Sequence, residues 1–353
     1  WRNLWKSKGY SAINIIGLAI GIAAAMLIML WVDSQYHYDR VYPKTDRIHI
    51  VGSIGKSNDE LSVYFVSPEP LAQVIQTTVP EVKQTCRLNK TRGFLFTIGD
   101  KKMIAGSGAF VDSTFMDMFQ LPVLAGGLDK ALVDPSTIVL TKDLAISLFG
   151  SADDAIGKNI QIDSTELVQV SAVLDEIPSN SRFAELTYFF PWTFLEKMDF
   201  NDDNWYNSST YSFVELLPNT NIAAVQRKLK YISHAHTDVK NNNFLKPIGE
   251  SYLYNNYKNG VVVGGRIEMV KIFIWIAIFI LVIACINFIN LSTAQSERRA
   301  KEVGVRKVVG AQRISLIWQF LSESILLVLI STILASVMVI LLLPEFSHLI
   351  GRK

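Results

Sequence analysis

The sequence predicts a membrane α-helical protein with three spans and an α+β extracytoplasmic domain. Three observations point to this class. Half of the 353 residues are hydrophobic, and the mean hydropathy of the chain is positive. Three stretches, each about 20 residues long, carry no charged side chain, and this is the length that a helix needs to cross a bilayer. A long polar segment with short alternating runs, typical of β-strands, separates the first two stretches.

The three apolar stretches are Ala12–Val32, Ile272–Asn290 and Ser324–Leu343. At roughly 1.5 Å per residue, each makes about 30 Å of helix. A backbone in lipid must satisfy its own polar groups, so we expect helices. Gly17 and Gly21 lie four residues apart in the first stretch, which would let a second helix pack closely against it. The ordinary glycine content of a membrane helix explains the same pair equally well.

Basic residues set the expected orientation. Arg2, Lys6 and Lys8 precede the first span without an acidic residue, and the segment 297–313 between the second and third spans is rich in arginine and lysine. Loops of this kind stay on the cytoplasmic side. We therefore expect a cytoplasmic N-terminus, with residues 33–268 outside the cytoplasm. Residues 1–10 fit a short helix that lies in the lipid interface.

The outside segment reads as mixed α and β over residues 44–257. Alternating runs predict six strands, at Arg47–Val51, Leu61–Val66, Ser136–Leu140, Asn159–Ile162, Leu167–Val173 and Tyr211–Leu217. Capping and periodicity predict three helices, at Pro68–Thr78 after a Ser67 cap, at Lys142–Phe149 and at Asn221–Ser233. We expect Asp33–Tyr42 to continue the first span as a polar stalk, and Asn255–Gly265 to be a loop that leads back to the membrane.

The outside segment shows no catalytic set, no metal site and no cofactor motif. His234 and His236 are two residues apart, which on a helix turns them about 200° from each other, so they do not share a metal. The glycines at 150 and 157 only faintly resemble a phosphate loop. Trp205, Tyr206, Tyr211 and Phe213 suggest either core packing or a binding face, and packing is the more frequent outcome.

The bulk charge and the cysteines exclude two further features. The formal net charge is only +2, so no binding of nucleic acid is implied. Cys86 lies in the polar segment and Cys285 in an apolar stretch, so we expect no disulfide between them.

The segment between the second and third spans, ERRAKEVGVRKVVGA at Glu297–Ala311, is the most informative. Two acid–base pairs at i,i+4 with the acid first favour a helix by about 0.2–0.5 kcal/mol each. Val305, Val308 and Val309 form an apolar stripe, and Gly310 is a natural helix end. A short charged helix cannot bury such a stripe alone. A docking site for another protein and a solvated loop both remain open from these residues.

Several stretches resemble the FtsX-like and MacB-like permeases of ABC transporters. They cover nearly the whole chain in order, at Arg2–Ala25, Val111–Gly127, Ile138–Asp163, Val173–Phe183 and Ile286–Ser324. The last of these, INFINLSTAQSERRAKEVGVRKVVGAQRISLIWQFLSES, is the most specific. The resemblance implies a multi-pass protein of the bacterial inner membrane, with a MacB-like periplasmic core domain that carries an inserted β-rich subdomain. It divides the chain at residues 1–43, 44–257 and 258–353.

The resemblance also implies a function and partners. A coupling helix would dock on a separate ABC ATPase subunit, so the chain itself would be a non-catalytic permease. That helix would comprise Lys301, Glu302, Val303, Gly304, Val305, Arg306, Lys307, Val308, Val309, Gly310 and Ala311. Two permease units would pair, and a periplasmic adaptor is a further expected partner. Efflux, lipoprotein extraction and control of cell-wall hydrolases all fit this mechanism. The alternative function is a membrane-anchored ligand sensor or regulator of a periplasmic enzyme such as a cell-wall hydrolase, and the docking helix argues against the sensor.

One departure concerns the number of spans. The family unit has a fourth span after the third, whereas this chain ends at Lys353. We therefore interpret the chain as the first part of a longer permease.

Overall fold

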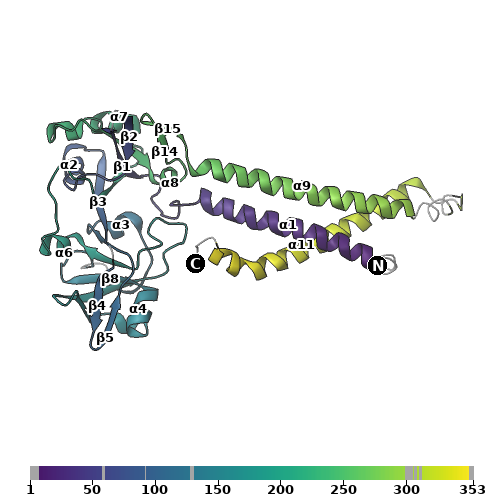
Figure 1. Cartoon of the computed structure of the whole chain (residues 1–353), viewed down its shortest axis with the longest axis horizontal. Helices are drawn as coiled ribbons and strands as arrows, with labels where there is room; N and C mark the ends of the chain where they lie inside the picture. Colours follow the sequence, from purple (N-terminus) through teal and green to yellow (C-terminus); the bar gives the residue numbers. More distant parts are fainter. Residues whose placement is uncertain are drawn as a thin grey trace. The chain divides into compact units, whose positions relative to one another are not determined.

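The computed structural model describes residues 8–57, 60–91, 93–127, 131–298, 305, 308–309 and 312–349. The chain divides into two compact units (Figure 1). One unit is helical and is built from the segments on either side of the other, which spans His37–Arg266 and contains the strands. The predicted class, membrane helices plus an α+β domain, is confirmed.

Among the described residues, the helical unit contains α1 (Lys8–Tyr36), α9 (Arg266–Arg298) and α11 (Arg313–Leu349). Three stretches in these helices are long and apolar enough to cross a membrane, at Ser11–Tyr36, Arg266–Ala294 and Ile317–Ser347. The three predicted spans are therefore confirmed.

Two helices differ in extent from the predicted segments. Helix α11 extends beyond the predicted span Ser324–Leu343, because it continues through Pro344 to Leu349. A proline removes one backbone hydrogen bond, and long apolar helices tolerate that loss. The stalk was expected to reach Tyr42, but α1 ends at Tyr36, and Asp39 adopts a left-handed conformation with φ of 57° that breaks the helix.

Small side chains bring α1 and α11 together. Ala19 and Ala23 of α1 are buried with Ala335 and Val339 of α11. Residues of this size allow two membrane helices to approach closely and gain van der Waals contact without a hydrophobic driving force. The helix pair therefore packs through a seam of alanines.

Strands occur along the whole length of the outer unit. They are β1 (Ile48–Ser57), β2 (Glu60–Tyr64), β3 (Val82–Thr91), β4 (Leu95–Ile98), β5 (Lys101–Ile104), β6 (Gly108–Val111), β7 (Val123–Gly126), β8 (Thr137–Thr141), β9 (Asn159–Ile162), β10 (Glu166–Leu174), β11 (Tyr188–Pro191), β12 (Tyr211–Leu216), β13 (Asn242–Pro247), β14 (Asn256–Lys258) and β15 (Val261–Gly264). The helices are α2 (Leu71–Thr78), α3 (Phe115–Phe119), α4 (Lys142–Phe149), α5 (Ala152–Ala155), α6 (Trp192–Lys197), α7 (Ile222–Leu229), the 3₁₀ turn η1 (Ile232–Ala235) and α8 (Ile248–Ser251).

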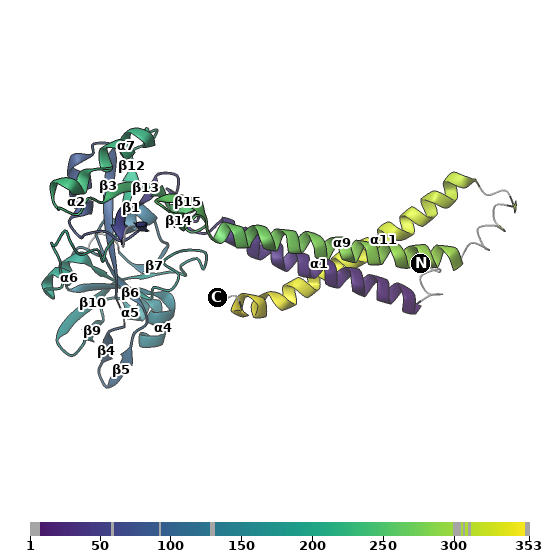
Figure 2. The ribbon, with the colours of Figure 1, turned by 45° about the horizontal axis from the view of Figure 1, so that its top comes forward.

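Within the described residues, thirteen of these strands form one mixed sheet, which Figure 2 shows from a second angle. The strand order is β13-β1-β12-β3-β6-β11-β8-β10-β9-β4-β5, with β2 paired to β1 and β7 paired to β10. The pairs β6–β11 and β8–β10 are parallel, and the other pairs in the sheet are antiparallel. A single hydrogen-bonded sheet therefore runs through the whole unit.

The core lies on both faces of this sheet, and β11 shows why. Phe189 packs into one buried cluster, whereas Tyr188 and Phe190 pack into another. Successive side chains of a strand point to opposite faces, so a strand that is apolar at every position is buried on both sides. In the first cluster the rings of Phe119 and Phe183 meet edge to face, with centroids 4.7 Å apart.

The six predicted strands are present, as β1, β2, β8, β9, β10 and β12. The predicted helix Lys142–Phe149 is confirmed at both ends, and Gly150 terminates it with a positive φ of 93°. The helix predicted from Asn221 is shorter than expected, because α7 ends at Leu229. Asn221 caps it, since its side chain accepts a hydrogen bond from the Ala224 amide.

Two other predictions in this unit are wrong. Ser67 does not cap the next helix, which begins only at Leu71. Its hydroxyl instead contacts the Ser212 hydroxyl at 2.7 Å, and its backbone pairs with Thr210. The expected loop Asn255–Gly265 contains the hairpin β14–β15, which turns at Asn259 and Gly260. Both turn residues have positive φ, the requirement of a two-residue hairpin turn.

Candidate functional site

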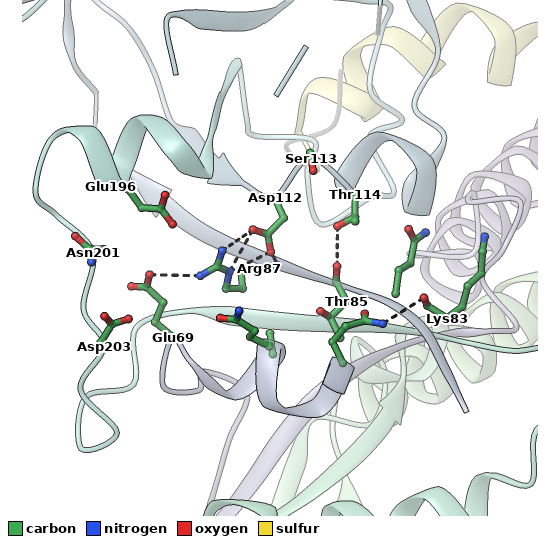
Figure 3. A pocket seen from close by; sticks show the side chains of 14 residues that line it. Glu69, Lys83, Thr85, Arg87, Asp112, Ser113, Thr114, Glu196, Asn201 and Asp203 are labelled. Atoms are coloured by element: carbon green, nitrogen blue, oxygen red, sulfur yellow. Dashed lines mark hydrogen bonds and ion pairs between the residues drawn. The ribbon is translucent and has the colours of Figure 1, made fainter. Parts of the chain in front are cut away.

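A polar groove of about 630 Å³ is the candidate binding site in the outer unit (Figure 3). Side chains of α2, β3, α6 and the loop after β6 line it. The sheet brings β3 and β6 together as antiparallel neighbours, with Leu88 opposite Val111. This register places Arg87 of β3 beside Asp112, the residue that follows β6.

Arg87 makes the closest charge contacts in the groove. Its guanidinium Nη2 lies 2.8 Å from Asp112 Oδ1, and its Nε lies 3.1 Å from Asp112 Oδ2. Its backbone amide donates to the same carboxylate. The guanidinium also stacks 4.2 Å from the ring centroid of Trp192. Bidentate pairing and stacking together fix an arginine more firmly than either contact alone.

Glu69 is the most buried acid of the groove, with 5% of its surface exposed. Its carboxylate accepts hydrogen bonds from Trp192 Nε1 at 3.1 Å and from the Asp202 amide at 2.8 Å, and it lies 3.5 Å from Arg87 Nη1. A buried charge with this many donors is satisfied without a ligand. The network therefore joins the start of α2, strand β3, helix α6 and the loop at 202.

The rim of the groove is polar and faces solvent. Glu196, Asn201 and Asp203 are exposed there, and Figure 3 shows them on the side of Glu69. The described lining contains neither histidine nor cysteine. The groove can therefore make hydrogen bonds and ion pairs to a polar molecule.

Gly17 and Gly21 lie against α9. A Cβ atom at Gly21 would overlap the Cβ of Ala284, and one at Gly17 would lie 3.3 Å from Asn287 Nδ2. One turn before Gly17, Asn14 Nδ2 donates to Ser292 Oγ of α9 at 3.4 Å. The two helices therefore approach along the face that carries both glycines.

The segment predicted to dock on an ATPase is described at Val305, Val308 and Val309. The other eight residues of the predicted helix 301–311 lie outside the described residues. The amide of Val309 donates to the Val305 carbonyl at 3.1 Å, which is the i to i−4 bond of an α-helix. The exposed fractions of the three valines are 65%, 89% and 82%. The described part of this segment is thus one helical turn with an exposed apolar stripe.

The other residues that the sequence singled out have structural roles. His236 stacks on Trp205 with centroids 4.2 Å apart, and His234 contacts the Asn241 carbonyl. Phe213 is buried in the core, whereas Tyr206 is 64% exposed, so the aromatic run forms no common face. No group of metal-binding side chains occurs among the residues that the structure describes. The weak phosphate-loop segment contains the short helix α5, capped by Ser151.

Sequence reasoning missed the charged contacts of the outer unit. Glu69 and Glu215 lie in predicted elements, whereas Arg87 lies in β3, which was not predicted, and nothing in their spacing marks them as partners. Their contacts join strands far apart in the chain, so a local pattern cannot reveal them. The Pro178–Phe183 stretch did carry a signal, because a polar run between two strands is typical of a turn with side-chain hydrogen bonds.

Two protein families match the chain. The MacB-like periplasmic core domain matches residues 11–232. The FtsX-like permease C-terminal domain matches residues 274–350. Together they cover most of the first helix, most of the outer unit, and most of the two helices that follow the outer unit.

Curated relatives match this chain over nearly its whole length. The pyoverdine export ATP-binding/permease protein PvdT of Pseudomonas savastanoi pv. phaseolicola is 21% identical over 93% of this chain and 48% of its own length. The macrolide export ATP-binding/permease protein MacB of Burkholderia cenocepacia is 21% identical over 94% of this chain and 47% of its own length. The chain therefore spans about half the length of these relatives.

A solved structure shares the fold of the outer unit. It is a permease-protein domain from Porphyromonas gingivalis, which is 23% identical and covers 58% of this chain and 92% of that domain. The TM-score is 0.50. At this identity the likeness shows the fold alone.

Proposed function

The chain belongs to the family of ABC transporter permeases with a MacB-like periplasmic core domain, and from this premise we propose that it transmits ATP-driven motion from a partner ATPase to its outer domain. The proposal places ATP hydrolysis outside residues 1–353 and gives this chain a mechanical, non-catalytic part. The two named relatives each combine ATP-binding and permease parts in one protein.

One observation carries the docking part of the proposal. Val305, Val308 and Val309 are exposed on a helical turn between two membrane helices. An exposed apolar stripe, here with charged residues on either side of it in the sequence, is typical of a protein interaction surface. The stripe lies within the FtsX-like match and between α9 and α11, where a force applied by another protein would act on both helices.

The proposed location follows from the distribution of charge. The loop between α9 and α11 and the N-terminal segment are basic, so we place both in the cytoplasm. Residues 33–268 then lie in the periplasm, and the membrane is the bacterial inner membrane. A second permease copy, membrane lipid and a periplasmic adaptor complete the proposed assembly.

The transported class is proposed as a substrate that the outer domain meets outside the inner membrane. The pyoverdine and macrolide relatives are named for export. The three spans predicted from the sequence contain no charged side chain that would line a polar path between them. Efflux or extraction driven by movement of the outer domain fits this composition better than passage through the helices.

The substitution Val308→Asp tests the docking role. A charge in the stripe should weaken binding of the partner ATPase by about 5- to 30-fold, the effect of losing one or two kcal/mol at an interface. The measurement is co-purification and titration of the ATPase with the full-length permease in detergent.

The matched control is Val261→Asp, which also charges an exposed valine but lies in the outer unit. It should leave ATPase binding unchanged. Equal binding of the ATPase by wild type and Val308→Asp would refute the docking role, as would a loss of binding in the control.

A further inference from the structure

The segment that joins α1 to β1, residues 37–47, contains a buried charge. Asp39 is completely buried. Its Oδ1 accepts a hydrogen bond from the Arg182 backbone amide at 2.8 Å, and its Oδ2 accepts one from Arg182 Nε at 2.9 Å. The terminal nitrogen Nη2 of the same arginine also lies 2.9 Å from Oδ2. One arginine therefore holds this carboxylate by its main chain and its side chain together.

The residues beside the arginine hold the same segment. Asn180 accepts a hydrogen bond at its carbonyl from the Asp39 amide at 2.8 Å. The Ser181 hydroxyl contacts the Tyr42 hydroxyl at 2.5 Å. Three consecutive residues in the loop between β10 and β11 thus bind the chain where it leaves α1. Directional bonds in this number fix orientation as well as position.

Helix α8 connects this contact to α9. Arg182 Nη2 donates to Ser251 Oγ at 2.6 Å, and the next residue, Tyr252, stacks on Tyr38 with ring centroids 3.5 Å apart. Arg266, the first residue of α9, lies with its guanidinium 4.6 Å from the Tyr252 ring centroid and donates to the Tyr252 hydroxyl at 2.9 Å. Helix α8 itself packs on β1 and β13.

A second buried charge holds the other end of the segment. Glu215 of β12 is completely buried. Lys44 Nζ and Arg47 Nη2 each lie 3.7 Å from its carboxylate. Lys44 also donates to the Asp117 carbonyl at 2.6 Å. The whole connection from 37 to 47 is therefore tied to the sheet by ion pairs at both ends.

Stability alone does not explain the Asp39–Arg182 pair. Burial raises the pKa of the Asp39 carboxyl, and the nearby Arg182 guanidinium only partly opposes that rise. Burying this ion pair therefore costs desolvation energy, and apolar residues of similar volume would often be at least as stable. A buried pair of this kind can instead fix one geometry among several.

We propose that the Asp39–Arg182 pair is the joint that transmits displacement of α1 to the sheet, and that α8 ties this joint to the first residue of α9. The inference rests on the proposed function and deepens it. Both connections to the membrane helices are then anchored at one place in the outer unit. Asp39 and Arg182 act as positioning residues, because they hold the segment that follows α1 against the loop between β10 and β11.

The test measures how firmly α1 and the sheet are joined in the full-length protein. Spin labels are placed on cysteines at Ile13 of α1 and Lys102 of β5, both exposed, in a Cys285→Ser background. Pulsed electron resonance then gives the distribution of label distances. Wild type should give a narrow distribution, and Asp39→Asn should broaden it about twofold or more, because a fixed joint becomes a hinge.

The control is Asp112→Asn, which removes a partner from an equally short arginine–aspartate pair that does not touch the segment 37–47. It should leave the distribution narrow. If Asp39→Asn fails to fold, the exchanged pair Asp39→Arg with Arg182→Asp keeps opposite charges in the joint and should narrow the distribution again relative to Asp39→Arg alone.

A narrow distribution of label distances in folded Asp39→Asn would refute the proposed role of the Asp39–Arg182 pair. An equal broadening in Asp112→Asn would refute it as well. A second experiment repeats the distance measurement with the partner ATPase present. Joint variants should bind it and hydrolyse ATP within about twofold of wild type while losing the ATP-dependent shift in label distance. Failure of the ATPase to bind wild type would refute the proposed function. The width of the label-distance distribution would still test the role of the Asp39–Arg182 pair, because that measurement needs no ATPase.

Discussion

Replacing Gly21 by alanine tests the contact between α1 and α9. The new Cβ atom would overlap the Cβ of Ala284, a backbone-fixed atom that cannot rotate away. The two helices must then separate or slide. Gly17→Ala is the matched substitution one turn earlier, where the new atom would meet Asn287 Nδ2 at 3.3 Å, the end of a side chain that can swing aside.

The expected magnitude follows from two opposing terms. Forcing an extra methyl group into a packed contact costs about 1–3 kcal/mol. Alanine gains up to about 1 kcal/mol over glycine in a helix. An overlap with a backbone-fixed atom belongs to the upper part of the cost range, about 2–3 kcal/mol. After the gain of about 1 kcal/mol, the net loss for Gly21→Ala is about 1–2 kcal/mol, which lowers the melting temperature by roughly 2–8 °C in a protein of a few hundred residues. Gly17→Ala should stay within about 1 °C of wild type or rise slightly.

The assay is thermal unfolding of the full-length protein in one detergent at one scan rate, followed by tryptophan fluorescence. The double variant Gly21→Ala with Ala284→Gly restores the room for one methyl group and should recover most of the lost temperature. A coupling energy of about 0.5–3 kcal/mol between the two sites is expected for side chains in contact. An unchanged melting temperature in Gly21→Ala, or the absence of coupling, would refute the close approach of these helices.

Two further predictions concern pH and topology. Burial lowers the pKa of His49 below its usual 6.5, so stability is fully present above about pH 6.5 and is lost as the pH falls, by up to about 1.4 kcal/mol per unit. The free energy of unfolding, measured with denaturant at about pH 7.5 and 5.5, should change less between the two pH values in His49→Asn than in wild type. An equal change in both proteins would contradict the role of His49 in this pH dependence. Single cysteines at Asn58 and Arg313 in a Cys285→Ser background test orientation with a membrane-impermeant thiol reagent. From the outside, only the cysteine at 58 should react, and the reverse pattern contradicts the topology.

The features that the sequence predicted are those that a short stretch of chain determines by itself. The three spans follow from apolar length, and Lys142–Phe149 follows from periodicity with a glycine at its end. The strand β11 escaped prediction because all four of its residues are buried, so it lacks the alternation that marks a half-exposed strand. The hairpin at Asn259-Gly260 carries a strong turn signal, but the asparagines and glycines around it are equally typical of a loop.

The charged contacts of the outer unit were beyond prediction for a different reason. Asp39 and Arg182 are separated by 143 positions in the chain, and each is an ordinary polar residue in its own neighbourhood. Only the complete sheet brings them together. Ser67 shows the same limit. Its hydroxyl, which could have capped the next helix, instead bonds to Thr210 and Ser212, 143 and 145 positions away in the chain. Long-range pairing therefore decided these residues against their local preference.

The place of β1 in the sheet has a consequence for biogenesis. Residues of β1 pair with β12 on one edge and with β13 on the other, and β13 begins at Asn242. Ribosomes add about 5–20 residues per second, so the strand waits roughly 10–40 s after its own synthesis for these partners. An apolar strand with open edges invites pairing with other chains during that interval. Nascent copies of this domain should therefore depend on chaperones until the last strand arrives.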